Sequence, residues 1–556
     1  MKNTAPIRRL RFGALLVLSF TAFADDEYLV TMDYKYAVTG FTYTGKAPTV
    51  EVWPTQNLAQ RWGARQMTED GKKSGRHFTF QTMLRDRYAR FLAFDADHKP
   101  LPISGDEIKL DTCDFGFMKK LGSETWEEKL KRLAWWRHDR FGMFIHFGLY
   151  SLPARHEWLK SKDRMSEEAY QRYFDNFNPV GFDAKEWAKA AKQAGMKYVV
   201  LTTKHHEGFC LFDSRFTDYK VTNTRFGRDI VKEYVEALRA EGLKVGFYYS
   251  VIDWHHPDYT MDNTHPRRLC QDWDPAVMTK EVVDKFNAGR DMNRYRAYVR
   301  NQVTELLTNY GKIDIIWFDF TPGGARYGEG KTREDWDSAG LVTLARRLQP
   351  GIIIDNRLDL HDYEDGQDFL TPEQCRSEEP PTFGGREWPW ETCQTFSGSW
   401  GYYRDEKTWK SRFQILEQLI QTVSCNGNLI MNVGPTGRGE FDHRAKERLA
   451  DYGEWMDRCG EAIYGCGRAP KELLEKRIPN TLYTYNAEKN ILYVHFLCWT
   501  TGPIPVPFAD KVKYSEFLHD RSEVPLDAVG RLQIPLDKPP VEIPVIAFTL
   551  KPPTDL

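Results

Sequence analysis

One local pattern recurs along the middle of this 556-residue chain: a helical run, then a glycine, then a short apolar stretch. A helix that leads through glycine into an entirely apolar strand is typical of parallel sheets covered on both faces. With an opening strand at 143–145, the pattern predicts five helix–strand pairs, at 184–194 and 197–201, 230–240 and 245–249, 292–309 and 313–318, 338–348 and 352–354, and 409–423 and 429–433.

Six such strands over residues 121–468 are typical of a (β/α) TIM-like barrel. The alternative is an open doubly wound sheet, in which a dinucleotide site carries G-x-G-x-x-G after a strand. No such motif follows any predicted strand, and polar residues gather at the strand ends. We therefore predict an α/β fold whose catalytic domain is a TIM-like barrel.

The two ends of the chain follow another pattern. Residues 25–120 hold short β-type runs between Gly, Pro, Asn and Asp turns, which predicts a small N-terminal β-rich module. After residue 468 the helical period disappears among many prolines, which predicts a C-terminal β-sandwich over 469–556.

Residues 1–24 have the features of a secretory signal peptide. Four basic residues precede the apolar run Phe12–Phe20, and Ala22-Phe23-Ala24 forms an A-x-A cleavage site. The run is short for a bilayer span, and no cysteine follows it to carry a lipid. We therefore expect a secreted or periplasmic protein without a membrane anchor.

Composition narrows the function classes. The formal net charge is −2 and no long basic run is present, which argues against nucleic acid as a partner. Nine cysteines are scattered without a C-x-x-C pair, so neither a disulfide scaffold nor a zinc site is indicated, although Cys459 and Cys466 are close enough in sequence to pair. Aromatic residues make up 14% of the chain, which suits sugar stacking and core packing equally.

Polar side chains close nearly every predicted barrel strand. Barrel enzymes take their catalytic groups from the carboxyl ends of the strands, so this rim is the candidate active site. In strand order the rim holds His146, the run 204–207 with His205 and His206, Tyr248 with Tyr249 and the run 253–256, Trp317 with Asp319, and the run 355–357 with Arg357.

Each rim residue also has a plainer interpretation. His205 and His206 are adjacent, so on an extended segment they point to opposite sides and cannot both bind one ion without a bend. They fit better as hydrogen-bond partners of sugar hydroxyls. Asp319 ends an apolar strand, where a charge is costly unless it faces a site or caps the next helix.

Retaining glycoside hydrolysis needs two carboxyl groups about 5 Å apart. Asp319 supplies the first. The second must come from the stretch 364–391, and spacing alone does not choose among its glutamates, which are Glu364, Glu373, Glu378, Glu379, Glu387 and Glu391.

An ordered series of motifs between 135 and 465 resembles the α-L-fucosidases of glycoside hydrolase family 29. The resemblance implies an exo-acting retaining α-L-fucosidase without cofactor or metal, acting on fucosylated oligosaccharides or glycoconjugates. The motifs are Trp135-Trp-Arg-His-Asp-Arg-Phe-Gly142, Ile145-His-Phe-Gly148, Glu157-Trp158, Thr203-Lys-His-His-Glu-Gly-Phe209, Phe247-Tyr-Tyr-Ser250, Asp253-Trp254, Trp317-Phe-Asp319, Asp355-Asn-Arg357, Trp390-Glu-Thr-Cys393, Ser399-Trp-Gly-Tyr402 and Asn428-Leu-Ile-Met-Asn-Val-Gly-Pro435.

The same resemblance assigns roles to individual residues. It implies that Asp319 is the nucleophile and that Glu373, in Thr371-Pro372-Glu373, is the acid/base, with Glu391 as the alternative. The residues implied to line the fucose pocket are His146, Glu157, Trp158, His205, His206, Tyr248, Trp317 and Arg357.

Two other functions stay open at this point. A related retaining enzyme, an α-L-galactosidase, would act on a sugar that differs only by a hydroxyl on C6, which an apolar pocket rejects weakly. A catalytically silent fucose-binding protein is the second, although it would be expected to lack one of the two carboxylates. Linkage specificity, oligomeric state and the role of the 25–120 module are not predicted.

Overall fold

The computed structural model describes residues 27–31, 37–55, 68–69, 76–79, 88–113, 120–266, 279–319, 330–361, 363–383, 386–500 and 502–552. The predicted signal peptide, residues 1–24, lies outside them. The chain divides into two compact units, Met1–Lys119 with Pro380–Trp388, and Lys120–Glu379 with Pro389–Leu556. Among the described helices, none is both long and apolar enough to cross a bilayer.

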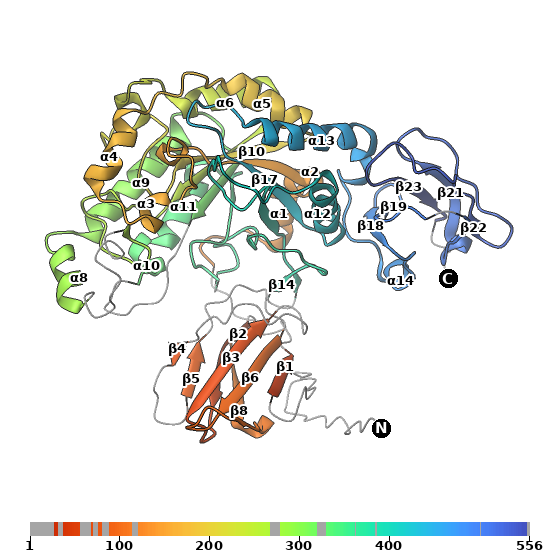
Figure 1. Ribbon diagram of the computed structural model, residues 1–556, viewed down its shortest axis with the longest axis horizontal. Helices are drawn as coiled ribbons and strands as arrows, with labels where there is room; N and C mark the ends of the chain where they lie inside the picture. Colours follow the sequence, from red (N-terminus) through yellow and green to blue (C-terminus); the bar gives the residue numbers. More distant parts are fainter. Residues whose placement is uncertain are drawn as a thin grey trace. The chain divides into compact units, whose positions relative to one another are not determined.

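The first unit contains two antiparallel sheets (Figure 1). The rings of Phe41 and Phe91 are fully buried and meet edge to face with centroids 4.9 Å apart, which joins one sheet to the other. A short hairpin, β14 (Thr382–Phe383) and β15 (Arg386–Glu387), also belongs to this unit. The sheets are β1 (Glu27–Thr31), β6 (Tyr88–Phe94), β3 (Thr49–Thr55) and β7 (Pro100–Leu101), and β4 (Thr68–Glu69), β5 (Arg76–Thr79), β2 (Ala37–Tyr43) and β8 (Ile108–Cys113).

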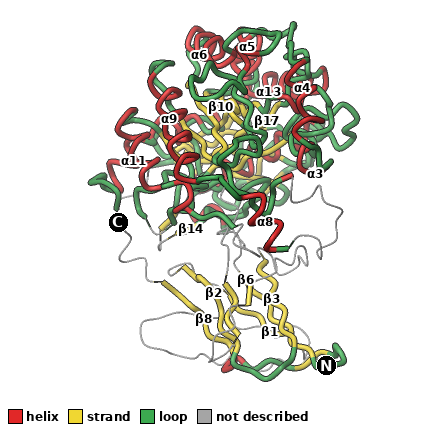
Figure 2. The backbone as a smooth tube through the Cα atoms, turned by 90° about the vertical axis from the view of Figure 1, so that its left-hand side faces the viewer, coloured by secondary structure: helices red, strands yellow, loops and turns green. Residues whose placement is uncertain are grey.

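The second unit is built on a parallel sheet of seven strands, which Figure 2 shows inside a layer of helices. The predicted TIM-like barrel with β-rich regions at both ends of the chain is confirmed. All six predicted strands are present, and a seventh, β16, was missed. In spatial order the strands are β13 (Ile353–Ile354), β12 (Ile315–Asp319), β11 (Lys244–Ser250), β10 (Tyr198–Lys204), β9 (Phe141–Ile145), β17 (Asn428–Val433) and β16 (Glu391–Thr395).

The segment 368–374 fills the gap between the two outer strands, β13 and β16. The Asp368 N–H donates to the Ile354 carbonyl of β13 at 2.8 Å. On the other side, Glu391 N–H donates to the Leu370 carbonyl at 2.8 Å. Pro372 has no N–H, so the segment pairs only through isolated bridges rather than as a regular strand. This segment, which carries Glu373, completes the ring of strands.

Alternate residues of each barrel strand point to opposite faces. On β10, Val199 and Leu201 pack outward into the large core beneath the helices. Tyr198 and Val200 point inward and pack in a separate core with Ile430. Because both faces are buried, six of the seven strands contain an apolar run, which is the pattern that the sequence showed; β16 is the exception.

The outer helices begin and end close to the predicted positions. Asp183 caps the first turn of α5 by accepting from Lys185 N–H at 2.8 Å. The following Gly195 has φ 84°, which closes the helix before β10. The helix predicted at 409–423 begins later, at Arg412, because Ser411 and Gln414 form a capping box.

Further helices complete this layer. The α-helices of the second unit are α1 (Trp126–Arg132), α2 (Ala134–Asp139), α3 (Leu159–Lys162), α4 (Glu167–Asp175), α5 (Ala184–Gln193), α6 (Ile230–Ala240), α8 (Lys280–Asn287), α9 (Met292–Thr308), α10 (Arg333–Trp336), α11 (Ser338–Leu348), α12 (Arg412–Ser424), α13 (His443–Cys459) and α14 (Lys471–Leu474).

The C-terminal part forms two antiparallel sheets that share a hydrophobic core containing Tyr483, Leu532 and Phe548. The Trp455 indole N–H of α13 donates to the Ile543 carbonyl at 3.0 Å and ties this part to the barrel helices. Cys459 and Cys466 are free thiols, so the suggested pairing is wrong. The sheets are β18 (Thr481–Asn486), β19 (Ile491–Phe496), β23 (Val545–Leu550) and β21 (Val512–Phe517), and β20 (Ile504–Pro505) with β22 (Arg531–Leu532).

Substitution of an inward-facing barrel residue should strongly destabilise the protein. Ile430 is completely buried in the inner core. Ile430→Ala should lower the free energy of unfolding by about 2–5 kcal/mol, because it removes buried methyl groups and leaves a cavity. Urea denaturation measures the loss. Val529→Ala is the control, since Val529 is 72% exposed; equal effects of both substitutions would contradict this account.

Candidate active site

A pocket of about 90 Å³ lies at the carboxyl ends of the barrel strands. It contains nine of the ten predicted site residues; Glu157 is the exception. A larger hollow of about 590 Å³ lies between α5 and α13, on the helical layer and away from the strand ends. The lining of the smaller pocket is Phe144, His146, Trp158, His205, His206, Tyr248, Trp317, Asp319, Arg357, Glu373, Cys393 and Trp400.

Asp319 ends β12 and is 8% exposed. Its Oδ1 accepts from Arg357 Nη1 at 2.9 Å, and its Oδ2 accepts from the Tyr248 hydroxyl at 2.8 Å. His206 Nε2 lies 3.8 Å from the same Oδ2. Two hydrogen bonds, one of them from the cation Arg357, therefore compensate the burial of this carboxylate and fix its orientation.

Arg357 joins two carboxyl groups. Its Nη2 lies 3.2 Å from Glu373 Oε2, while its Nη1 bonds to Asp319. Its Nε donates to Thr371 Oγ1 at 3.0 Å, and its guanidinium lies 4.5 Å from the centroid of the Trp317 ring. Burial opposes its charge, but the carboxylates of Asp319 and Glu373 raise the pKa of Arg357 above its ordinary value. The guanidinium is therefore a fixed positive charge between the two carboxylates.

The three histidines of the pocket are neutral. Burial is the largest cause in each case: it lowers the pKa of His146 and of His206 to about 3, and that of His205 well below its ordinary value. His146 Nδ1 lies 2.6 Å from Asn432 Oδ1, and His206 Nδ1 lies 2.7 Å from Ser250 Oγ. Neutral imidazoles both donate and accept hydrogen bonds, which suits hydroxyl groups.

His205 and His206 lie on the same side of the barrel, although adjacent residues of an extended strand would point apart. The register of β10 shifts between Thr202 and Lys204, and the strand ends there. The chain then bends, and the two imidazole rings lie with centroids 4.1 Å apart. The bend brings both histidines into one pocket.

Glu157 is buried behind the lining rather than within it. Its Oε2 accepts from Gly401 N–H at 2.8 Å and from Trp400 N–H at 3.1 Å. Burial raises the pKa of Glu157. In this structure its contacts hold the backbone that presents Trp400, and its predicted contact with a sugar hydroxyl stays a prediction.

Three lining residues were not predicted as site residues: Phe144, Cys393 and Trp400. Cys393 and Trp400 belong to motifs quoted above, so the signal was present without a role attached to it. Phe144 is part of an apolar strand run, where nothing in sequence distinguishes a lining residue from a core residue.

The structure separates the two candidates for the second carboxyl group. Glu373 lines the pocket, and its side chain is 37% exposed. Glu391 starts β16, pairs with Asn428 at the start of β17, and accepts from the hydroxyl of Tyr198 at the start of β10. Glu391 therefore lies at the amino ends of the strands, away from the pocket.

Burial raises the pKa of Glu391 to about 7, although the hydroxyl of Tyr198 and the indoles of Trp136 and Trp317 act in the opposite direction. This carboxyl group is 1% exposed and sits inside the apolar barrel. An ionised carboxylate is poorly solvated there, so the neutral form is favoured up to near-neutral pH.

Comparison with known proteins identifies one family. The family model for alpha-L-fucosidase matches residues 118–461. Plasma alpha-L-fucosidase of Homo sapiens is 30% identical over 410 residues, covering 68% of this chain and 79% of that protein. Tissue alpha-L-fucosidase of Mus musculus is 29% identical over 459 residues, covering 75% of this chain and 91% of that protein.

Solved structures that are similar to this chain are also alpha-L-fucosidases. Alpha-L-fucosidase isoenzyme 1 from Paenibacillus thiaminolyticus has a TM-score of 0.68 and 43% identity, covering 76% of this chain and 100% of that chain. A GH29 alpha-L-fucosidase from Bacteroides thetaiotaomicron, trapped as a covalent intermediate with 2-fluoro-fucosyl fluoride, has a TM-score of 0.63 and 27% identity, covering 79% and 99%.

Glu391 should make the stability of the protein depend on pH. Its pKa of about 7 in the folded state lies above the ordinary 4.5, so between these values the folded chain keeps a proton that the unfolded chain releases. This stabilisation is complete below about pH 4.5 and is lost as pH rises through about 7.

Over that range the wild type should lose roughly 1–3 kcal/mol of unfolding free energy relative to Glu391→Gln, whose side chain does not titrate. Urea denaturation of both proteins at the two ends of the range measures the difference. A difference that does not change with pH would contradict the raised pKa.

Proposed function

The chain belongs to the α-L-fucosidase family, and on this premise we propose that it removes terminal α-L-fucose from glycans by double displacement with retention of configuration. It is a glycoside hydrolase. The observation that carries the proposal is that one guanidinium, Arg357, holds Asp319 and Glu373 together in a pocket of about 90 Å³. Two neighbouring carboxyl groups beside a small pocket are what the removal of a single sugar residue by this mechanism requires.

In the first step Asp319 is the nucleophile. Its carboxylate attacks the anomeric carbon while protonated Glu373 donates its proton to the departing glycosidic oxygen. The bond to that oxygen breaks, and a fucosyl ester with Asp319 forms. The hydrogen bonds from Tyr248 and Arg357 orient the Asp319 carboxylate for this attack.

In the second step Glu373, now a carboxylate, takes a proton from water. The resulting hydroxide equivalent attacks the anomeric carbon, the ester bond to Asp319 breaks, and fucose leaves with its original configuration. The side chain of Glu373 is 37% exposed, so water reaches it. The Bacteroides thetaiotaomicron relative, solved as a trapped covalent intermediate, supports this two-step route.

The remaining lining residues bind the sugar. Neutral His146, His205 and His206 form hydrogen bonds with its hydroxyl groups. The rings of Trp158 and Trp317 contact its apolar face and the C5 methyl group. The natural substrate is a fucosylated oligosaccharide or glycoconjugate. Because the lining supplies all groups that the mechanism needs, we assign no cofactor.

The predicted export and domain division are part of this proposal. The basic residues, apolar run and A-x-A site of residues 1–24 support cleavage of a signal peptide and a secreted or periplasmic location. A module at 25–120, a catalytic barrel at 121–468 and a C-terminal β-sandwich at 469–556 follow the changes in sequence pattern.

Asp319→Gly tests the nucleophile. We expect at least a thousandfold loss of kcat on an aryl α-L-fucoside, on the order of the loss of a catalytic nucleophile. Azide should restore turnover, because it fits the vacated space and gives β-L-fucosyl azide, which NMR identifies. Asp319→Asn is the matched control: it removes the nucleophile without opening space, so azide should not rescue it. A full-rate Asp319→Gly enzyme would refute the assignment.

Glu373→Ala tests the acid/base. Its kcat/KM should fall about 10²–10⁴-fold on fucosides with poor leaving groups and little on 2,4-dinitrophenyl fucoside, which needs no proton. Azide should accelerate the second step and give α-L-fucosyl azide, opposite in configuration to the Asp319→Gly product. Glu391→Gln is the control. If it shows the leaving-group dependence and Glu373→Ala does not, the acid/base is Glu391.

A further inference from the structure

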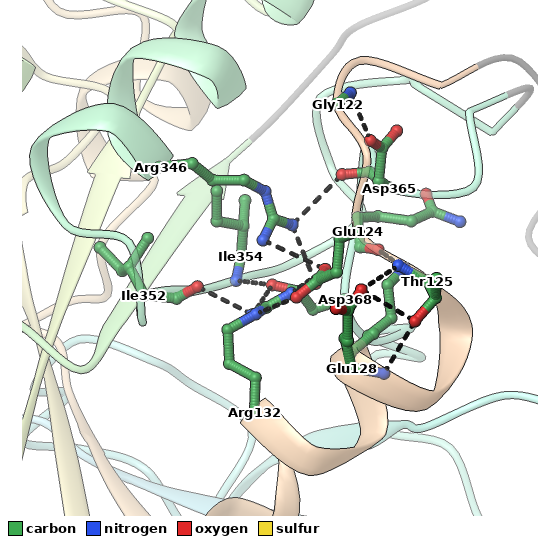
Figure 3. A network of polar contacts seen from close by, with 12 residues as sticks. Gly122, Glu124, Thr125, Glu128, Arg132, Arg346, Ile352, Ile354, Asp365 and Asp368 are labelled. Atoms are coloured by element: carbon green, nitrogen blue, oxygen red, sulfur yellow. Dashed lines mark hydrogen bonds and ion pairs between the residues drawn. The ribbon is translucent and has the colours of Figure 1, made fainter.

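A partly buried ion network surrounds Asp368, at the start of the segment that closes the barrel (Figure 3). We call its members, Glu124, Arg132, Arg346 and Asp368, the Asp368 network. Arg132 comes from the end of α1 and Arg346 from α11. Two cations thus converge on one carboxylate that is itself completely buried.

The carboxylate of Asp368 accepts four hydrogen bonds. Its Oδ1 accepts from Arg132 Nη2 at 2.7 Å and from Arg346 Nη2 at 2.9 Å. Its Oδ2 accepts from Arg132 Nη1 at 2.9 Å and from the Ile354 N–H of β13 at 2.8 Å. Burial opposes the charge, but both arginines hold the pKa of Asp368 well below its ordinary value. The carboxylate is fixed to a helix, to a second helix and to a barrel strand at once.

Glu124 completes the charge balance. It pairs with Arg132 through two hydrogen bonds, Nε to Oε1 at 2.7 Å and Nη2 to Oε2 at 2.6 Å. Its Oε2 lies 3.7 Å from Arg346 Nη1. Paired geometry of this kind allows buried charges to persist, and removing one partner leaves another charge uncompensated.

The chain just before Asp368 is held as well. Lys129 Nζ donates to the carbonyls of Glu364 and Gln367, the latter at 2.8 Å. The carboxylate of Asp365 accepts from the backbone N–H groups of Leu121 and Gly122 at 2.7 and 2.6 Å. Both contacts fix the chain just before the segment 368–374, which we call the closing segment.

Glu373 follows Asp368 five positions later in the same segment. Between them, Thr371 is held by Asn356, whose Oδ1 accepts from Thr371 N–H at 3.0 Å. Beyond Glu373, Gln374 N–H donates to the Cys393 carbonyl of β16 at 2.9 Å. None of the described residues that line the pocket belongs to the Asp368 network. The network therefore has no direct contact with Glu373 and acts on it through the backbone, along this segment and by way of β13, which leads to Arg357.

We propose that the Asp368 network positions Glu373 for proton transfer, so that its members are positioning residues for general acid–base catalysis. This inference rests on the proposed role of Glu373. A proton donor must reach the glycosidic oxygen within hydrogen-bond distance, and a displacement of about 1 Å is enough to cost on the order of 10²-fold in rate. The segment has a proline and isolated bridges in place of a regular ladder, so the network adds an anchor at its start.

Asp368→Asn is the test, because it keeps the size of the side chain and removes its charge. We expect kcat/KM for a fucoside with a poor leaving group to fall about 10- to 100-fold, and that for 2,4-dinitrophenyl fucoside to stay within about threefold. In the Glu373→Ala background Asp368→Asn should add no further loss, since both act on the same proton transfer. Arg346→Met, which removes one of the two arginines, should give a smaller change of the same kind if Asp368→Asn does not fold.

Glu305→Gln is the matched control for stability. Glu305 is a buried carboxylate of α9 that accepts from Ser214 Oγ at 2.8 Å and Arg215 N–H at 2.9 Å, away from the closing segment. Thermal unfolding of each variant is measured beside its kinetics. Destabilisation without a dependence on the leaving group is expected for this control.

The outcomes separate this inference from the proposed function. If Glu373→Ala shows the leaving-group dependence and Asp368→Asn or Arg346→Met shares it, the positioning role is supported. If Glu373→Ala shows the leaving-group dependence but the network variants lose activity equally on all substrates, the positioning role of the network is overturned. The acid/base role of Glu373 then stands. If Glu373→Ala lacks the dependence, the acid/base assignment fails, and the positioning role fails with it.

Discussion

The contact on which the site depends is that of Arg357 with two carboxylates. As carboxylates, Asp319 and Glu373 would repel each other across a small pocket. Arg357 Nη1 lies 2.9 Å from one and Nη2 lies 3.2 Å from the other, so a single planar guanidinium neutralises and spaces both. Its Nε bond to Thr371 and its position over Trp317 limit the freedom of the guanidinium itself.

The barrel supplies this contact because its parallel strands all end at one rim. Asp319 ends β12, Arg357 follows β13, and Glu373 lies on the irregular segment between β13 and β16. The segment occupies the place of a regular strand, and the ion pairs of Asp368 add contacts at its start. The proposed site and the closure of the barrel therefore depend on the same segment.

The regular parts of the fold could be predicted because local patterns determine them. A helix such as α6, Ile230–Ala240, has its cap, apolar face and final glycine within one short stretch of sequence. Strand β16 was missed because its run Glu391–Thr395 is polar; it pairs with β17, and all five of its residues are buried. The bend that brings His205 and His206 together was missed for a similar reason, since it follows a register shift against β11.

Asp319 could be proposed as a site residue from sequence alone, because a charge that ends an apolar strand has few favourable places other than a site. The ordered motifs then identified the family and its sugar. Spacing could not choose between Glu373 and Glu391, since both lie in the stretch 364–391, and only the family resemblance favoured Glu373. The tertiary structure separates their positions, because it places Glu373 beside Arg357 at the rim and Glu391 beside Tyr198 inside the barrel. The physical reason is that sequence records which groups are present, whereas the distance between groups far apart in the chain is decided by how the strands pair and close.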